Sequence, residues 1–408
     1  MITALKLFDF KNFARETLGA GPFTVIVGAN ATGKSNIRDA FRFLHGIGRG
    51  YALSEIVGGK HGAGGQLEWE SIRGGPREIS RAGSGVFAFS VALTVKSRKF
   101  SYFAGVASEA FGESGFKIGL ETLVVDNETV YHWRNEELTL NGEKLAKDTQ
   151  RIFRRDQPIL AQLHEMQAGK DVDLLVGTIV EAFASMRFLD LAPDSMRQPS
   201  FPGQTVLGDR GENLPSVLKE LCAKPEHKDV LMQWTRELTP MDMEDVEFPL
   251  DPAGRVHLVL RERGRKETTA FSASDGTLRF LAMLAALLGP DPAQLYFLEE
   301  IDNGIHPSRL SLLVDLIERQ TAKGGSQVIA TTHSPELLTI MGDVTFNNTS
   351  VVCRLEGADD AVIRPVAELP NAAKLRKSQG LGRLLTSGWM ETAVTFSEDD
   401  ENGREVSE

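Results

Sequence analysis

The sequence is poor in cysteine, in long apolar runs and in net positive charge. Its two cysteines, Cys222 and Cys353, have a spacing that suits neither a metal site nor a disulfide framework, so we expect reduced core residues. The longest apolar run, Phe280–Leu288, is far too short to cross a membrane. Charged residues near the N-terminus interrupt any apolar core that a signal peptide would need. We therefore expect a cytoplasmic protein without a membrane partner.

The charge balance also limits the classes of partner. A net charge of −11 argues against a protein that coats nucleic acid in general, although it leaves room for a local basic groove. A hydrophobic content of 41% over 408 residues is enough to bury a sizeable core, in one large domain with insertions or in several smaller ones.

The most informative stretch is a glycine-rich loop that fits the pattern G-x-x-x-x-G-K-[ST]. An apolar run, 23–27, precedes the loop, and residues spaced for one helix face follow it. Backbone N–H groups of such a loop can cradle phosphates. Lys34 is expected to reach the β- and γ-phosphates of ATP, and the Ser35 hydroxyl is expected to bind Mg²⁺. The predicted nucleotide-binding residues are Gly28, Ala29, Asn30, Ala31, Thr32, Gly33, Lys34, Ser35 and Asn36.

Two further short apolar runs end in polar residues suited to nucleotide chemistry. The run 295–298 is followed by Glu299 and Glu300, and the run 328–330 is followed by Thr331, Thr332 and His333. In parallel α/β sheets, ligands bind at the carboxyl ends of strands. We assign Glu299 to Mg²⁺, Glu300 to activation of the attacking water, and His333 to the γ-phosphate or the water.

A small, hydroxyl-bearing turn, Ser272–Thr277, comes directly before an almost entirely apolar helix. Such a turn at a helix N-terminus is suited to bind an anion, although an ordinary capped helix start has the same pattern. Because one phosphate loop is already present, a second anion site implies a second phosphate. A two-fold dimer, in which Ser274, Asp275 and Gly276 cap the nucleotide of the other subunit, satisfies this requirement.

The rest of the chain divides into four predicted parts. Residues 1–150 form an N-terminal lobe with the phosphate loop and an antiparallel β subdomain. Residues 151–240 form a helical insertion, and 241–396 form a C-terminal lobe with the turn and both polar strand ends. The acidic, polar tail at 397–408 is predicted to be disordered.

Together these segments resemble the ABC-type ATPases of the RecF/SMC/OLD group. The resemblance lies in LFDFKNF at 7–13, GANATGKSN at 28–36, ASDGT at 273–277, LYFLEEIDNGIHP at 295–307 and TTHSP at 331–335. They look like the opening strand, Walker A loop, ABC signature, Walker B and D-loop, and switch histidine. The signature looks closest to the SDGT form of OLD-like predicted ATPases. The resemblance implies an α/β P-loop NTPase fold, an ABC-type ATPase head with a mixed or parallel core sheet.

The sequence departs from the family pattern in places. Ala31 replaces a loop glycine, and Asp275 replaces the first signature glycine, which adds a negative charge near a phosphate site. The glutamine of the Q-loop has no secure position, and Gln157 is the candidate for it and for a metal contact. No long coiled-coil arm is encoded, and the chain after residue 335 is short for the nuclease domain of OLD proteins.

The resemblance favours an ATPase that dimerises on ATP and regulates a partner effector, a nuclease for example, in prokaryotic defence against phage or plasmids. The alternative is a DNA-repair clamp of the RecF/SMC kind. Its DNA contacts would be the basic clusters 151–155 and 261–266, although such clusters are commonly solvated faces. A small-molecule kinase would leave the turn and both polar strand ends unexplained, and no coupling partner supports a transporter subunit.

Overall fold

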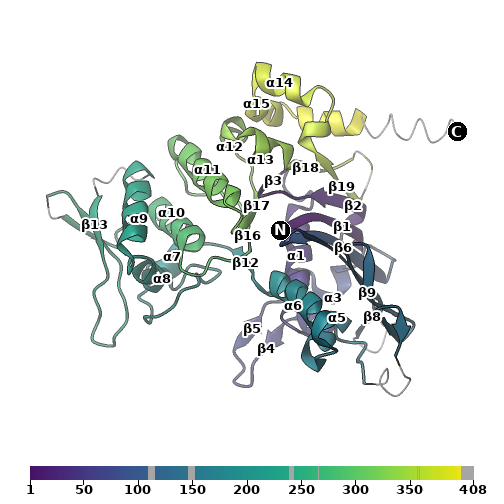
Figure 1. Ribbon diagram of the computed structural model, residues 1–408. Helices are drawn as coiled ribbons and strands as arrows, with labels where there is room; N and C mark the ends of the chain where they lie inside the picture. Colours follow the sequence, from purple (N-terminus) through teal and green to yellow (C-terminus); the bar gives the residue numbers. More distant parts are fainter. Residues whose placement is uncertain are drawn as a thin grey trace.

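A six-stranded sheet lies at the centre of the computed structural model, which describes residues 1–108, 115–145, 152–238, 243–264, 266–355, 357 and 359–396. The predicted disordered tail at 397–408 lies outside these residues. The strand order is β12-β16-β17-β3-β18-β19, and every neighbouring pair is parallel except β18 and β19 (Figure 1). The strands are β3 (Phe23–Val27), β12 (Met186–Leu189), β16 (Leu295–Leu298), β17 (Gln327–Thr331), β18 (Thr349–Arg354) and β19 (Ala361–Pro365). The predicted mixed core sheet is confirmed, with one antiparallel pair at its edge.

Alternate residues of the central strands enter two different hydrophobic cores. On one face Phe297 packs against α1, where its ring lies 5.8 Å from that of Phe41. On the other face its neighbour Leu298 joins the core that contains α10 and α11. The helices are α1 (Lys34–Gly48), α10 (Asp275–Leu288) and α11 (Pro307–Ala322). Because both faces are covered, the central strands β3, β16 and β17 are short, mostly apolar runs that the sequence reveals directly.

An eight-stranded antiparallel sheet lies beside the core, in the order β11-β10-β9-β8-β7-β6-β1-β2. The predicted antiparallel subdomain is thus present, and the opening hairpin forms one edge of it. The strands are β1 (Ile2–Phe10), β2 (Phe13–Gly19), β6 (Val86–Val95), β7 (Arg98–Ser108), β8 (Phe116–Val125), β9 (Glu128–Arg134), β10 (Glu137–Leu140) and β11 (Glu143–Lys144). The turn between β10 and β11 contains Asn141 and Gly142.

Helices prevail in the described part of 151–240, as predicted, but this stretch also supplies β12. That strand forms an edge of the central sheet, paired in parallel with β16, so the stretch does not stand apart from the core. Its helices are α5 (Ile159–Met166), α6 (Lys170–Ala184), α7 (Pro193–Met196), α8 (Leu214–Leu221) and α9 (Pro225–Leu238).

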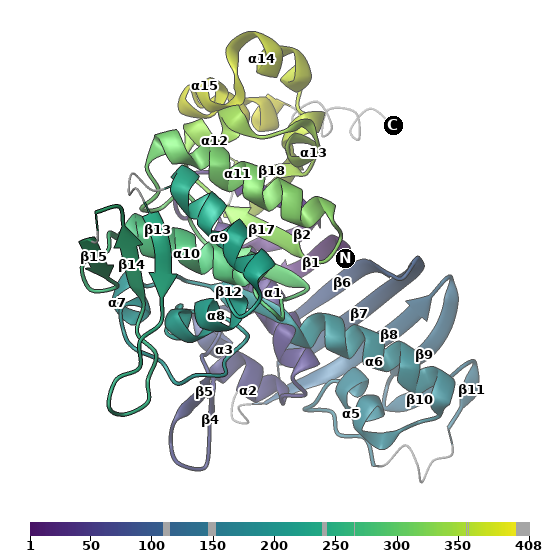
Figure 2. The ribbon, with the colours of Figure 1, turned by 60° about the vertical axis from the view of Figure 1, so that its left-hand side comes forward.

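The remaining elements cover the periphery. In Figures 1 and 2, α7–α10 and the three-stranded sheet β13-β14-β15 form a lobe on the side of the core away from β6–β9. No helix in the described ranges is long and apolar enough to span a membrane. The peripheral elements are α2 (Leu53–Gly58), β4 (Lys60–His61), β5 (Leu67–Trp69), α3 (Gly75–Glu78), β13 (Met243–Glu247), β14 (Val259–Glu262), β15 (Lys266–Thr269), α12 (Pro335–Ile340), α13 (Asp343–Asn347), a 3-10 turn at Val366–Glu368, α14 (Ala372–Gln379) and α15 (Leu381–Thr386).

Candidate active site

The phosphate loop connects the buried strand β3 to α1. Gly33 precedes the helix with φ of 121°, and Gly28 ends the strand region with φ of 151°, both in backbone conformations that glycine adopts freely. Ala31, at φ of 60°, occupies the left-handed region, where a side chain costs about 1 kcal/mol. The Lys34 ammonium donates hydrogen bonds to the carbonyls of Gly28 at 2.8 Å and Ala29 at 2.6 Å, so it lies folded over the loop.

Burial sets the charge state of this lysine. Lys34 is only 8% exposed, and desolvation lowers its pKa to about 8, although the nearby Glu300 carboxylate acts in the opposite direction. The desolvated Lys34 ammonium interacts more strongly with a phosphate than with the neutral loop carbonyls, because the phosphate carries a full negative charge.

The opening hairpin supports the loop from outside. Asn12, between β1 and β2, donates to the Thr32 carbonyl at 3.0 Å and accepts a hydrogen bond from the Asn36 amide at 2.6 Å. Asn36 lines the pocket but uses this amide group on the hairpin. The sequence analysis did not identify Asn12, because its role depends on two segments that meet only in the folded chain.

The predicted metal-binding pair is in direct contact. The Ser35 hydroxyl donates to Glu299 Oε1 at 2.9 Å, which joins the start of α1 to the end of β16. Two guanidinium groups share the same carboxylate: Arg73 Nη2 is 3.2 Å from Oε1, and Arg38 Nε is 3.4 Å from Oε2. Arg73 also donates to the Ser35 carbonyl at 3.1 Å. It comes from the glycine-rich stretch 46–85, in which no pattern distinguished it.

Strand β17 positions the second acid. The Thr331 hydroxyl accepts the N–H of Glu300 at 3.0 Å, and Glu300 has a left-handed φ of 48°. A side chain in this conformation is uncommon and is found where surrounding contacts hold it. The carboxylate faces the pocket, where Asn303 Nδ2 lies 3.4 Å from its Oε2.

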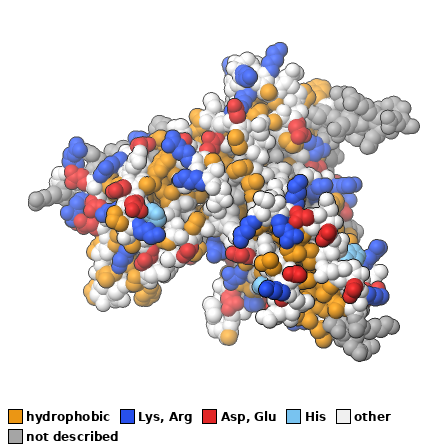
Figure 3. Space-filling model, viewed as in Figure 1, with side chains coloured by type: hydrophobic (Ala, Val, Ile, Leu, Met, Phe, Trp, Pro, Cys, Tyr) orange, Lys and Arg blue, Asp and Glu red, His pale blue; other side chains and the backbone are white. Residues whose placement is uncertain are grey.

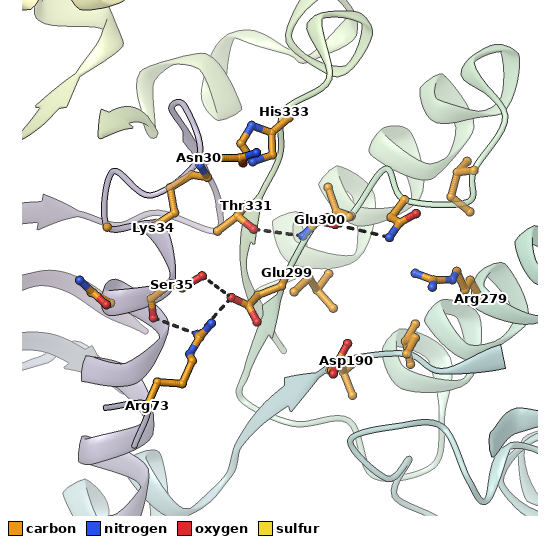
Figure 4. Close-up of a pocket in the computed structure, with 18 of the residues that line it drawn as sticks. Asn30, Lys34, Ser35, Arg73, Asp190, Arg279, Glu299, Glu300, Thr331 and His333 are labelled. Carbon is orange, nitrogen blue, oxygen red and sulfur yellow. Dashed lines mark hydrogen bonds and ion pairs between the residues drawn. The ribbon is translucent and has the colours of Figure 1, made fainter. Parts of the chain in front are cut away.

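His333 follows β17 and lines the same pocket on the side of the phosphate loop, near Asn30 (Figure 4). Partial burial, together with the nearby Lys34 charge, lowers the pKa of His333, although Glu300 and Asp302 act in the opposite direction. The imidazole is therefore neutral at pH 7, with one N–H to donate and one nitrogen to accept.

These side chains line one pocket of about 460 Å³, within the usual range of about 300–1,000 Å³ for small-ligand sites. Strand ends and the loop bring together Asn30, Ala31, Gly33, Lys34, Ser35, Asn36, Glu299, Glu300 and His333. Besides Arg73, the pocket wall contains Asp190, which follows β12, and Arg279 on α10, neither of which the sequence pointed to (Figure 4).

The signature turn lies outside this pocket. Ser274 caps α10, accepting the Thr277 N–H at 3.1 Å, and it is exposed. Asp275 is paired with Arg197 at 2.6 Å. Gly276 lies against the loop after β16, so closely that a Cβ there would be 2.4 Å from the Gly304 carbonyl oxygen.

Gln157, the candidate for the Q-loop and a metal contact, does not line the pocket either. Its Nε2 donates to the Gly50 carbonyl at 3.0 Å, at the far end of α1 from the phosphate loop. Strand β12, which pairs with β16, instead brings Asp190 to the pocket.

The oxygen atoms at the start of α1 and the end of β16 fit a magnesium ion. Mg²⁺ prefers hard oxygen ligands and is bound by one or two protein groups together with substrate phosphates and water. Ser35 and Glu299 supply such a pair. Among the described residues no cluster of three or more His, Cys, Asp or Glu could hold a metal by itself.

Comparison with solved structures finds the fold of this chain in an SMC head. An SMC head bound to the C-winged helix domain of ScpA aligns with a TM-score of 0.50 at 15% identity, over 90% of this chain and 99% of that one. The SMC head domain from Thermotoga maritima aligns with a TM-score of 0.43 at 16% identity, over 90% and 98%. At these identities only the fold is shared.

Sequence comparison gives a relative and a family. A Helicobacter pylori protein (strain ATCC 700392 / 26695) named ATP/GTP phosphatase is 34% identical over 92 residues, which are 21% of this chain and only 24% of that protein. A protein family described as "AAA domain, putative AbiEii toxin, Type IV TA system" matches residues 23–339. The likeness to OLD proteins in particular stays a prediction. The chain belongs to this AAA-domain family, and it has the P-loop ATPase fold of ABC-type and SMC heads.

Proposed function

We propose that this protein hydrolyses ATP in a two-fold dimer whose closing and opening control a separate effector protein. The observation that carries the proposal is the position of the signature turn. One chain supplies the phosphate loop, both acids and the histidine to its pocket, whereas Ser274, Asp275 and Gly276 point elsewhere and are at least partly exposed. A second copy could place this turn, at the N-terminus of a long helix, against the nucleotide of the first.

Five residues of the pocket have a role in this proposal. Lys34 leaves the loop carbonyls for the β- and γ-phosphates. Ser35 and Glu299 hold Mg²⁺, which neutralises phosphate charge when bound. Glu300 orients the attacking water and accepts its proton, and neutral His333 donates a hydrogen bond to the γ-phosphate or the water.

The acid in the signature turn is compatible with this arrangement. The carboxylate of Asp275 would repel a phosphate, but Arg197 pairs with it at 2.6 Å and also donates to the Ala273 carbonyl at 3.2 Å. Because Arg197 cancels the charge and holds the turn, the N–H groups at the start of α10 stay available to a phosphate oxygen.

A separate effector is the simplest output for such a switch. The solved SMC head carries a bound domain of ScpA, and the family description refers to a toxin of a Type IV system. By extension, we propose that this chain acts with a partner such as a nuclease or toxin, in defence against phage or plasmids.

The alternative, an ATP-dependent DNA clamp, loses support from the basic clusters. In the first, Arg154 pairs with Asp156 and Arg155 pairs with Glu136. In the second, the described cations pair with acids of the same small sheet: Arg261 with Glu247, Arg263 with Glu244 and Lys266 with Glu262. Figure 3 shows acidic and basic side chains intermixed over the lobe that contains β13. Paired cations release fewer counterions on DNA binding and add less affinity.

Mixing two inactive variants tests the shared site. Ser274→Arg disrupts the signature turn, and Lys34→Ala disrupts the phosphate loop. A dimer of either variant alone therefore contains no complete ATPase site. In a random mixture, heterodimers hold one complete site, and about a quarter of the wild-type ATPase rate returns. Ser378→Arg on α14, also exposed, is the matched control and should leave the rate unchanged. No recovery in the mixture would overturn the shared site.

A further inference from the structure

A second cavity, which we call the arginine pocket, lies behind the nucleotide pocket and has no role in the function proposed above. It lies between α1, the β4–β5 hairpin, the end of β12 and the 206–212 loop, and its volume is about 570 Å³. Arg38, Arg42 and Arg187 line it together with the aromatic residues Trp69 and Phe188. Asp190 lines both cavities.

The cationic groups of this cavity are compensated only in part: the charge of Asp209 acts on all three arginines, and Arg42 Nη2 donates to the Glu70 carbonyl at 3.1 Å. Arg42 is 9% exposed, and its Nε has no hydrogen-bond partner among the described residues. Its closest ion pair is with the exposed Glu70 at 3.5 Å. Arg187 donates to the Met186 carbonyl, and no ion pair of Arg187 is found in the part of the chain that the structure describes. A buried guanidinium without a full partner is costly, and an anion would remove that cost.

Aromatic rings fix these guanidinium groups in place. The Arg42 guanidinium lies 4.9 Å from the centre of the Trp69 ring, and that of Arg38 lies 5.8 Å from the Phe188 ring. Both rings are buried, at 7% and 3% exposed, so they hold the arginines rather than offer a surface for stacking. His45 adds no charge to the floor, because burial lowers its pKa to about 4.

The rim of the cavity limits the size of the ligand. Glu68, Glu70, Asp209 and Glu212 are exposed and lie around the opening. A nucleic-acid strand would have to pass its phosphates over these carboxylates, whereas a small ligand can enter with its charged group directed to the floor. Three guanidinium groups that line one cavity supply several N–H donors, which suits the several oxygen atoms of a phosphate group.

We propose that the arginine pocket binds a small phosphorylated ligand, with its phosphate or diphosphate group held by Arg38, Arg42 and Arg187. The volume is larger than inorganic phosphate needs and suits a sugar phosphate or a mononucleotide. Arg38 links the two cavities, because its Nε also contacts Glu299 Oε2 at 3.4 Å. A ligand that draws Arg38 away leaves Glu299 less neutralised, so bound ligand raises the affinity for Mg²⁺ and nucleotide. This coupling, unlike the binding itself, rests on the proposed function.

Binding is measured first in the full-length Lys34→Ala variant, so that the nucleotide pocket contributes little. The probes for calorimetry or equilibrium dialysis are pyrophosphate, ribose 5-phosphate, AMP, adenosine and a single-stranded oligonucleotide. The phosphorylated small molecules should saturate one site per chain, and adenosine should not bind. Arg42→Gln together with Arg187→Gln should weaken binding at least tenfold. Arg98→Gln together with Arg319→Gln removes the same charge from exposed ion pairs and should have no effect.

Each other outcome overturns a stated part of the proposal. The proposed binding site is wrong if the probes show no saturable binding at millimolar concentration. It is also wrong if the variant with both Arg42→Gln and Arg187→Gln binds them as tightly as the protein without these two changes. If adenosine binds as tightly as AMP, the site does not recognise a phosphate group. If the oligonucleotide binds more tightly than the small molecules, the ligand is not a small molecule. If the double variant fails to fold, the half-buried Arg187→Gln alone serves the same comparison.

The coupling is tested with the wild-type phosphate loop, where the ligand should lower the Mg²⁺ needed for nucleotide binding at least threefold. A protein that binds the probes but does not hydrolyse ATP would retain this site and lose the proposed function.

Discussion

The hydroxyl of Ser35 donates a hydrogen bond to Glu299 at 2.9 Å, although 264 residues separate them in the chain. Two motifs that were recognised separately thus meet at one point, at the carboxyl ends of the parallel strands β3 and β16, which lie on either side of β17. A bound Mg²⁺ would take the place of this hydrogen bond, because both oxygens are suitable ligands.

Ser35→Ala tests this relationship. Loss of the hydroxyl should raise the Mg²⁺ concentration for half-maximal ATP hydrolysis at least tenfold and change nucleotide binding without Mg²⁺ less than threefold, because Lys34 and the loop remain. Magnesium titrations of the ATPase rate and of nucleotide binding measure both effects. Ser378→Ala, on an exposed helix, is the control. An unchanged magnesium requirement would contradict the assignment of Ser35.

The depressed pKa of Lys34, about 8, predicts a pH dependence of nucleotide binding. A phosphate beside the ammonium raises that pKa in the complex. Between pH 6.5 and 7.5 Lys34 is mostly charged with or without ligand, so it adds little pH dependence. Above pH 8 it must take up a proton on binding, so affinity falls by up to about tenfold per pH unit until the pKa of the complex is reached. Lys34→Ala should lose about 100-fold in affinity, near 3 kcal/mol, and this alkaline dependence as well.

Calorimetry in two buffers of different ionisation enthalpy detects the proton uptake directly. Uptake should approach one proton for each nucleotide near pH 9 and be absent in Lys34→Ala. A wild-type affinity that stays constant from pH 7.5 to 9.5 would show that Lys34 is already strongly charged in the free protein.

The sequence identified the parts of this site that are local in the chain. The phosphate loop, the paired acids and the histidine each follow a short apolar strand, so each strand and its polar residues lie in one short segment of the chain. Their meeting could be predicted because parallel strands place their carboxyl ends together.

Residues whose roles depend on distant segments could not be found in the same way. Asn12 contacts the phosphate loop from the turn between β1 and β2, which belong to the other sheet. Arg73 contacts Glu299, which is 226 residues away in the chain. Asp190 follows β12, a strand that lies within a mostly helical stretch. Gln157, the Q-loop candidate, does not line the pocket, and a glutamine beside arginines carries no information about where the chain folds. Its amide is instead used on the Gly50 carbonyl.

Glu300→Gln should retain ATP binding and lose at least 100-fold in turnover. The backbone N–H bond to Thr331 and the left-handed φ of 48° suit Gln as well as Glu, so the shape of the site is preserved while the base is lost. With ATP the variant should accumulate as a closed dimer, which light scattering after gel filtration detects. Glu128→Gln, on exposed β9, is the control. Continued hydrolysis together with an unchanged size in ATP would rule out Glu300 as the group that orients water.

Gly276→Ala tests the contact between the signature turn and the loop after β16. Its new Cβ would lie 2.4 Å from the Gly304 carbonyl oxygen, which is backbone and cannot rotate away, so turn and loop must separate. Overpacking of this kind costs about 1–3 kcal/mol of unfolding free energy. Because the same loop follows Glu300, the ATPase rate should fall by at least tenfold even below the melting temperature. Gly325→Ala, where no atom lies within 4 Å of the added Cβ, should leave stability and rate nearly unchanged. If Gly276→Ala and Gly325→Ala melt at the same temperature and hydrolyse ATP equally, the signature turn and the loop are not in the tight contact described here.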